Sequence, residues 1–241
     1  MAIVKKQSSS KQIIEYILDR VQKRELKSGD KLPNEREFSE MLGVSRVPLR
    51  EAISALSLLG ILDARQGEGT FVNKYDSAIL GKVIYTYTIL DNTSMDEILE
   101  VRKMMEADAA KLASENASEE DLREIRVAME QRDKELELYK RFDGNGELVY
   151  EHDSHFHHAI AEATHNRFCV QFLDAIRQSA REQHQSGFNK HDLSAYETAS
   201  DFHHRIYDAI SSGNAAEAYE VMYKHIESVQ EATRRLNVKG S

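Results

Sequence analysis

Aspartate and histidine residues in the second half of this sequence have the spacing of metal ligands. Asp153 and His157 are four residues apart in a stretch predicted to be helical, so both side chains leave one helix face, about 6 Å apart. An imidazole and a carboxylate at that separation can share one divalent ion. Histidine is dense in this stretch, however, and any one such residue more often has a surface or packing role. The pair needs further ligands to make a site.

Two later histidines are placed to supply them. His203 lies ten residues before Gly213, and His225 lies eleven residues after Asn214, where two predicted helices meet. At a rise of 1.5 Å per residue the two arms measure roughly 15 and 17 Å, so an antiparallel hairpin would bring the two histidines level. His204 is the main rival of His203 for this position.

Arginines near the N-terminus could contact nucleic acid. Arg46 and Arg50 are one helical turn apart, beside Ser45 and opposite the apolar side of a predicted helix. Guanidinium groups on the first turns of a helix suit the major groove, because arginine can donate two hydrogen bonds to one guanine. Arg36, at the start of the preceding helix, could reach a phosphate. Two arginines alone are more often solvated helix charges, so the surrounding pattern decides.

The elements around these arginines form a winged helix-turn-helix pattern. Apolar residues at helical spacing predict three helices, over residues 11–26, 34–43 and 45–60. Two short strands, over residues 61–65 and 70–72, flank a glycine-rich tip and predict a β-hairpin wing.

The histidines belong to a second, all-helical region. Six long helices are predicted at roughly 95–115, 119–142, 147–164, 166–186, 192–212 and 214–236. The predicted fold is therefore mainly α, with a winged helix-turn-helix over residues 10–75 and an antiparallel helical bundle over residues 94–236. Residues 76–93 are a linker whose conformation the pattern leaves open, and residues 1–9 and 237–241 are tails.

Charge and composition agree with two regions of different function. The 241-residue chain has a net charge of −9, but residues 1–75 carry 13 Lys and Arg against 10 Asp and Glu, so the acidic excess lies in the remainder. A basic front and an acidic back suit a DNA-binding module joined to a part that does not touch DNA. The single cysteine, Cys169, excludes an internal disulfide and a cysteine-based zinc cluster, as expected of a cytoplasmic protein. We expect no membrane segment, since the longest apolar stretch is too short.

The N-terminal region resembles the GntR family of bacterial regulators. The resemblance covers nearly all of residues 10–73 and rests on three ordered blocks: residues 29–37 (GDKLPNERE), 42–52 (LGVSRVPLREA) and 67–72 (GEGTFV). Gln66, at the wing tip, matches a variable position that tunes operator choice. The resemblance implies double-stranded operator DNA as partner and DNA-contacting roles for Arg36, Ser45, Arg46, Arg50 and Gly69.

The second region resembles the FadR-like subgroup of that family, with its FCD effector domain. Residues 153–166 (DSHFHHAIAEATHN) match the signature Asp-x-x-Phe-His-x-x-Ile-Ala. Many members of the subgroup hold a divalent metal with one Asp and three His, and by resemblance the ligands here are Asp153, His157, His203 and His225. Such a set without thiolates suits zinc best, with nickel, manganese or iron as alternatives.

Arg102 matches a position that often faces the ligand pocket in this subgroup. It could pair with the carboxylate of a small organic or sugar acid bound at or near the metal. A surface salt bridge with Glu106 or Glu100 is an equally good interpretation.

Three functions are compatible with these residues. The first is a DNA-binding transcription regulator, as a homodimer on a two-fold operator, whose affinity responds to a carboxylate effector. The second is a regulator for which the metal itself is the signal. The third, a metal-dependent hydrolase, has little support, because no recognised general-base motif flanks the site and an attached winged helix would be unexplained. We therefore expect a regulator and not an enzyme.

Overall fold

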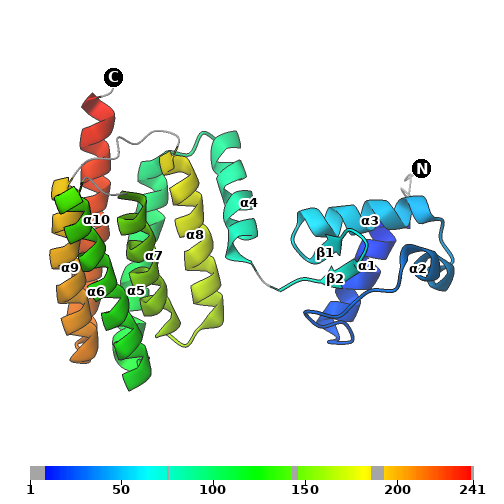
Figure 1. Ribbon diagram of the computed structural model, residues 1–241, viewed down its shortest axis with the longest axis horizontal. Coiled ribbons are helices and arrows are strands. Elements are labelled where there is room, and N and C mark those ends of the chain that lie inside the picture. The colour runs from blue at the N-terminus through cyan, green and yellow to red at the C-terminus, as the bar shows by residue number, and fades with distance from the viewer. Residues whose placement is uncertain (1–8, 75, 143–145, 186–192, 240–241) are drawn as a thin grey trace, which may run out of the picture. The chain divides into compact units, whose positions relative to one another are not determined.

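The computed structural model describes residues 9–74, 76–142, 146–185 and 193–239. The chain divides into two compact units, Met1–Ile79 and Leu80–Ser241. Helices dominate both, with one two-stranded antiparallel sheet among the described residues (Figure 1). The predicted fold class is confirmed.

Three helices build the first unit: α1 (Ser9–Gln22), α2 (Glu35–Leu42) and α3 (Arg46–Leu58). The Asn34 side chain caps α2 by accepting a hydrogen bond from the backbone N–H of Glu37. Gly43 ends α2 in the left-handed conformation, with φ of 64°. Both residue types predict these boundaries. Helix α1 stops short of the expected residue 26, because the chain turns at Arg24, whose φ is 59°.

The wing consists of β1 (Leu62–Arg65) and β2 (Gly69–Val72), paired antiparallel with Leu62 opposite Val72. Lys31 adds an isolated bridge to Phe71, which ties the wing to the segment before α2. The apolar faces of the helices and the wing enclose one core, formed by Ile13, Ile17, Leu32, Phe38, Leu49, Ala52, Ile53, Leu56, Leu62 and Val72. This unit therefore has a core of its own.

The second unit contains the helical bundle. Its helices are α5 (Met95–Asn116), α6 (Glu119–Phe142), α7 (Gly146–Glu162), α8 (Arg167–Gln185), α9 (Leu193–Ser211) and α10 (Ala215–Lys239). Helix α5 packs against α7, α8, α9 and α10, so it is central to the bundle, and α6 packs against α7 and α9. All six predicted helices are present, and α10 continues past the expected end at residue 236.

The expected linker over residues 76–93 is largely helical, since Ser77–Leu90 forms α4. Helix α4 lies alongside α8 (Figure 1). Gly81 permits this approach: a Cβ there would lie 2.9 Å from the backbone oxygen of Ala175 and 2.7 Å from Gln178. Ile84 packs on Ile98 and Ile176. The helix therefore packs on the bundle through contacts with residues far away in the sequence, which the local sequence pattern does not reveal.

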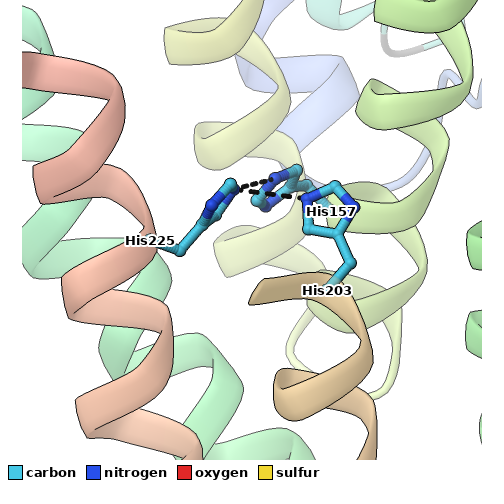
Figure 2. A group of neighbouring side chains, drawn as sticks. All are labelled: His157, His203 and His225. Carbon is cyan, nitrogen blue, oxygen red and sulfur yellow. Dashed lines mark hydrogen bonds between the residues drawn. The ribbon is translucent and has the colours of Figure 1, made fainter. Parts of the chain in front are cut away.

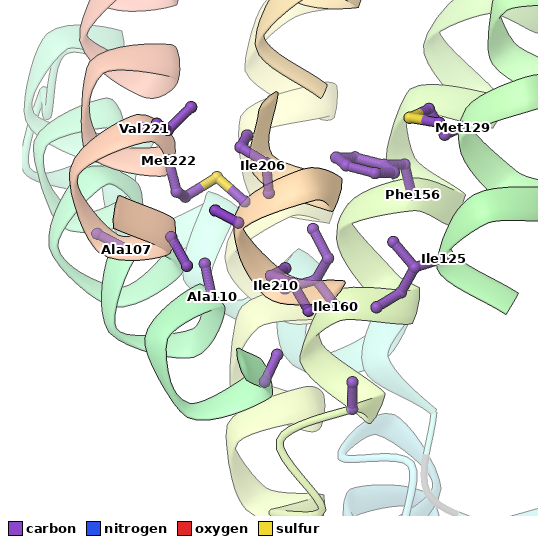
Figure 3. Packing of buried hydrophobic residues seen from close by; sticks show 14 of the residues in the cluster. Ala107, Ala110, Ile125, Met129, Phe156, Ile160, Ile206, Ile210, Val221 and Met222 are labelled. Carbon is purple, nitrogen blue, oxygen red and sulfur yellow. The ribbon is translucent and has the colours of Figure 1, made fainter. Parts of the chain in front are cut away.

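Small and branched side chains fill the centre of the bundle (Figure 3). Alanines on α5, including Ala107 and Ala110, allow α10 to approach closely, and Phe156, Ile160 and Ile206 complete the layer from α7 and α9. Phe156 is fully buried. Among the described residues, no helix combines the length and apolar character needed to cross a membrane.

Candidate functional site

Three histidines from three helices converge inside the bundle (Figure 2). His157 lies on α7, His203 on α9 and His225 on α10. The Nε2 atom of His225 is 3.3 Å from that of His203 and 3.2 Å from that of His157. One ligand atom from each residue lies within 4.8 Å of the other two. The helical hairpin of α9 and α10 does bring His203 and His225 level.

Asp153 approaches two of these histidines from one turn earlier on α7. Its carboxylate oxygens lie 3.5 Å from Nε2 of His203 and 3.7 Å from Nε2 of His157. Burial raises the pKa of this carboxyl, but the nearby His157 and Arg132 outweigh burial, so the pKa falls below its ordinary value. Asp153 is therefore an anion at neutral pH, on the side of the cluster facing His157 and His203.

His203 and His225 are neutral at neutral pH. His203 and His225 are buried, and burial lowers the pKa of both well below the ordinary value, because a charged imidazolium loses its hydration there. Neighbouring histidines lower these pKa values further. Neutral imidazoles keep the lone pair that metal binding requires.

Glu106 on α5 supports the cluster from behind His157. Its Oε2 atom lies 2.6 Å from Nδ1 of His157, on the ring edge opposite Nε2. Burial raises the pKa of Glu106, but Arg102, His157 and Arg177 outweigh it and hold the pKa well below its ordinary value. A carboxylate at the second nitrogen of a ligand histidine fixes the ring and its tautomer.

Arg102 is buried beside this carboxylate. Its Nε donates a hydrogen bond of 2.7 Å to Oε1 of Glu106, and the side chain is 10% exposed. Of the two sequence interpretations, the ion pair with Glu106 is therefore formed, inside the bundle and not on its surface. Arg102 is therefore connected to the histidine cluster through Glu106, which contacts both Arg102 and His157.

Two further buried arginines went unnoticed in the sequence. Arg177 on α8 donates a hydrogen bond of 2.5 Å to Oδ1 of Asp174, and its guanidinium lies 3.8 Å from the carboxylate of Glu106. Arg132 on α6 lies 3.2 Å from Asp153. A signal for Arg132 was present, because it occupies a core position in the helical spacing Ile125, Met129, Arg132, Leu136.

The donor set fits a divalent metal ion. Three imidazole nitrogens and one carboxylate, with no thiolate, suit zinc, nickel, manganese or iron. The Nε2 atoms of the three buried histidines already lie close together inside the bundle, and Glu106 supplies an outer partner. His204, the rival of His203, is about half exposed and lies 2.7 Å from Asp133 on α6, away from the triad contacts.

The predicted DNA-contacting residues of α3 are exposed on the first unit. Ser45 is the N-cap residue of α3 and its side chain makes no capping hydrogen bond. Arg46 and Arg50 follow on the exposed face, while Leu49 between them is fully buried. Arg50 donates 2.6 Å to Glu35 on α2, and 64% of its side chain remains exposed. The helix therefore presents both guanidinium groups outward.

The remaining predicted contacts lie on α2 and the wing. Arg36 is exposed and only loosely paired with Glu40, at 3.9 Å. Gln66 and Gly69 are exposed at the wing tip. Gly69 has φ of +116°, a conformation that side-chain-bearing residues rarely adopt, so the tight tip requires glycine.

Comparisons with known proteins match both units. Residues 9–72 match the family described as bacterial regulatory proteins, gntR family, and residues 97–228 match the FCD domain. The chain is 31% identical to the HTH-type transcriptional regulator LutR of Bacillus subtilis, over 86% of this chain and 93% of that protein. It is 28% identical to the putative L-lactate dehydrogenase operon regulatory protein of Escherichia coli, over 95% of this chain and 87% of that protein.

A solved structure agrees with the sequence matches. The protein titled Streptococcus agalactiae GntR superposes with a TM-score of 0.67 at 25% identity, covering 92% of this chain and 99% of that one. The match to this structure covers both units, as the two family matches do.

Proposed function

This chain belongs to the gntR family of bacterial transcriptional regulators, with an FCD effector domain, and we propose that a metal-assisted carboxylate site in that domain controls its affinity for operator DNA. The effector is a small organic or sugar acid, and the metal is zinc. The regulator acts as a homodimer on a two-fold operator in the cytoplasm, where that DNA lies.

The observation that carries the proposal is the buried histidine triad with Asp153 beside it. Together, Asp153, His157, His203 and His225 would hold one divalent ion. A bound ion would supply Lewis-acid attraction for a carboxylate. Arg102 would add a guanidinium donor at the same site, next to Glu106.

The exposed arginines support the DNA-binding half of the proposal. Arg46 and Arg50 would read base edges from α3, and Arg36 and Ser45 would contact the backbone of the DNA. Gln66 and Gly69 would approach the sugar-phosphate chain at the wing tip. Glu35, which holds Arg50, would keep its guanidinium oriented before DNA binds.

The relatives support a metabolite as the signal. One bears the name of an L-lactate dehydrogenase operon regulator, and lactate is a small hydroxy acid. The relatives are named as transcriptional regulators and not as enzymes, so the hydrolase interpretation is set aside.

The test is a titration of promoter DNA from the neighbourhood of this gene. We expect the zinc-loaded protein to bind one such fragment and to change its affinity when a small carboxylate is added. Arg102→Gln should remove the response to carboxylate while leaving DNA affinity intact. Arg126→Gln, an exposed arginine on α6, is the matched control. DNA affinity that no carboxylate changes would contradict the effector proposal.

The same titration separates a second candidate, in which the metal itself is the signal. The observation that favours it is the burial of all three histidines, which makes the site sensitive to occupancy. If a chelator alone changes operator affinity in a folded protein, the ion is the input. If chelation only abolishes the carboxylate response, the ion is part of the effector site.

A further inference from the structure

Arg132 is a charged side chain at the centre of the helical unit. Its exposed fraction is 0%, and it is the largest of the fully buried side chains among the described residues. Burying a guanidinium is unfavourable unless its hydrogen bonds are made inside the protein. Its contacts must therefore account for its position.

These contacts connect three helices. Arg132 lies on α6, and its Nε donates a hydrogen bond of 3.2 Å to Oδ1 of Asp153 on α7. One of its terminal nitrogens donates a hydrogen bond of 2.9 Å to the backbone oxygen of Tyr196 on α9. The other terminal nitrogen lies 3.8 Å from Asp133 and makes no hydrogen bond in the described part of the chain. Arg132 is thus held at Tyr196 and holds Asp153.

Asp153 needs such a partner more than the histidines do. Phe156 stacks on the ring of His203, with centroids 4.2 Å apart, and Glu106 contacts the ring of His157. The side chain of Asp153 is 24% exposed, and Arg132 donates the one hydrogen bond found for it in the described residues. Without Arg132, the carboxylate is free to rotate away from the triad.

We propose that Arg132 is a positioning residue that holds the Asp153 carboxylate against the histidine triad and thereby sets the metal affinity of the site. The inference rests on the proposed metal site. Its alternative is electrostatic, since a guanidinium near a divalent cation repels it. Positioning and repulsion predict opposite signs when the charge is removed, so the two can be separated.

The experiment is a double-mutant cycle on zinc affinity of the full-length protein, measured by competition with a chromophoric chelator. Arg132→Met should weaken zinc binding by about 10–100-fold, the usual loss when an outer partner of a metal ligand is removed. Arg132→Lys should also weaken it, because one ammonium cannot span Asp153 and Tyr196. In an Asp153→Ala background, Arg132→Met should have no further effect.

Each other outcome is decisive. Tighter zinc binding by Arg132→Met would show that repulsion dominates and would overturn the proposal. An equal loss in both backgrounds would mean that Arg132 only supports the fold, and would overturn it too. Arg126→Met, exposed on the same helix, is the control. Thermal melting of the metal-free variants identifies any that fail to fold; if Arg132→Met does so, the cycle is run with Arg132→Lys. A wild-type protein that binds no zinc would instead refute the proposed metal site.

Discussion

The two units use arginine in opposite ways. In the first unit, Arg46 and Arg50 are exposed on a helix whose other face lies in an apolar core. In the helical unit, Arg102 and Arg132 are buried and bonded to carboxylates beside the histidine triad. An exposed guanidinium keeps its donors for a polyanion, whereas a buried one directs them at carboxylates inside the protein. The difference teaches that burial, and not residue type, assigns the role.

The largest effect is expected from breaking the triad. His203→Ala should lower zinc affinity by more than about 100-fold, beyond the loss caused by an outer partner, because it removes a ligand from a buried site. Zinc should then no longer raise the melting temperature of the protein. Calorimetry with and without zinc measures both. His204→Ala, one residue along and half exposed, is the control and should bind zinc as wild type does.

The exposed arginines come next. Arg46→Ala and Arg50→Ala should each weaken operator binding by roughly 10–100-fold, the value of one bidentate arginine–base contact. Zinc affinity and melting temperature should stay unchanged, because neither residue belongs to a core. Fluorescence anisotropy at fixed salt measures the DNA affinity. Unaltered operator binding by both variants would remove α3 as the recognition helix.

A third prediction concerns α4. Gly81→Ala places a methyl group 2.9 Å from a backbone oxygen of α8, and such overpacking should cost about 1–3 kcal/mol of unfolding free energy. Urea denaturation measures this cost. Thr86→Ala, exposed on the same helix, should cost much less. If the glycine variant is as stable as wild type, α4 does not pack on α8 as described.

The smallest effects compare two N-caps of the first unit. Asn34→Ala should lower the unfolding free energy by about 1 kcal/mol, because it removes the hydrogen bond to Glu37. Ser45→Ala should cost less stability, since its hydroxyl makes no capping bond, but should weaken operator binding. Denaturation and anisotropy on both variants test the contrast. A Ser45 variant that loses stability and keeps full operator affinity would reverse the assignment.

The sequence by itself predicted whatever depends on neighbours along the chain. Asn34 and Gly43 mark the two ends of α2, because helix capping depends on residues close in sequence. Asp153 and His157 share a helix face because they are one turn apart. The proximity of His203 and His225 followed from their nearly equal distances, along the two helices, from the turn that joins them. Helical periodicity and the turn residues were enough for these features.

Only the tertiary structure decided the contacts between distant segments. It set the distance between His157 and the hairpin histidines, which the sequence had grouped only by resemblance, paired Arg102 with Glu106 in the interior, and placed Arg132 beside Asp153. It also made the expected linker a helix packed on α8. Periodicity reports which face of a helix is buried but not which helix covers it, so partners far apart in sequence depend on packing.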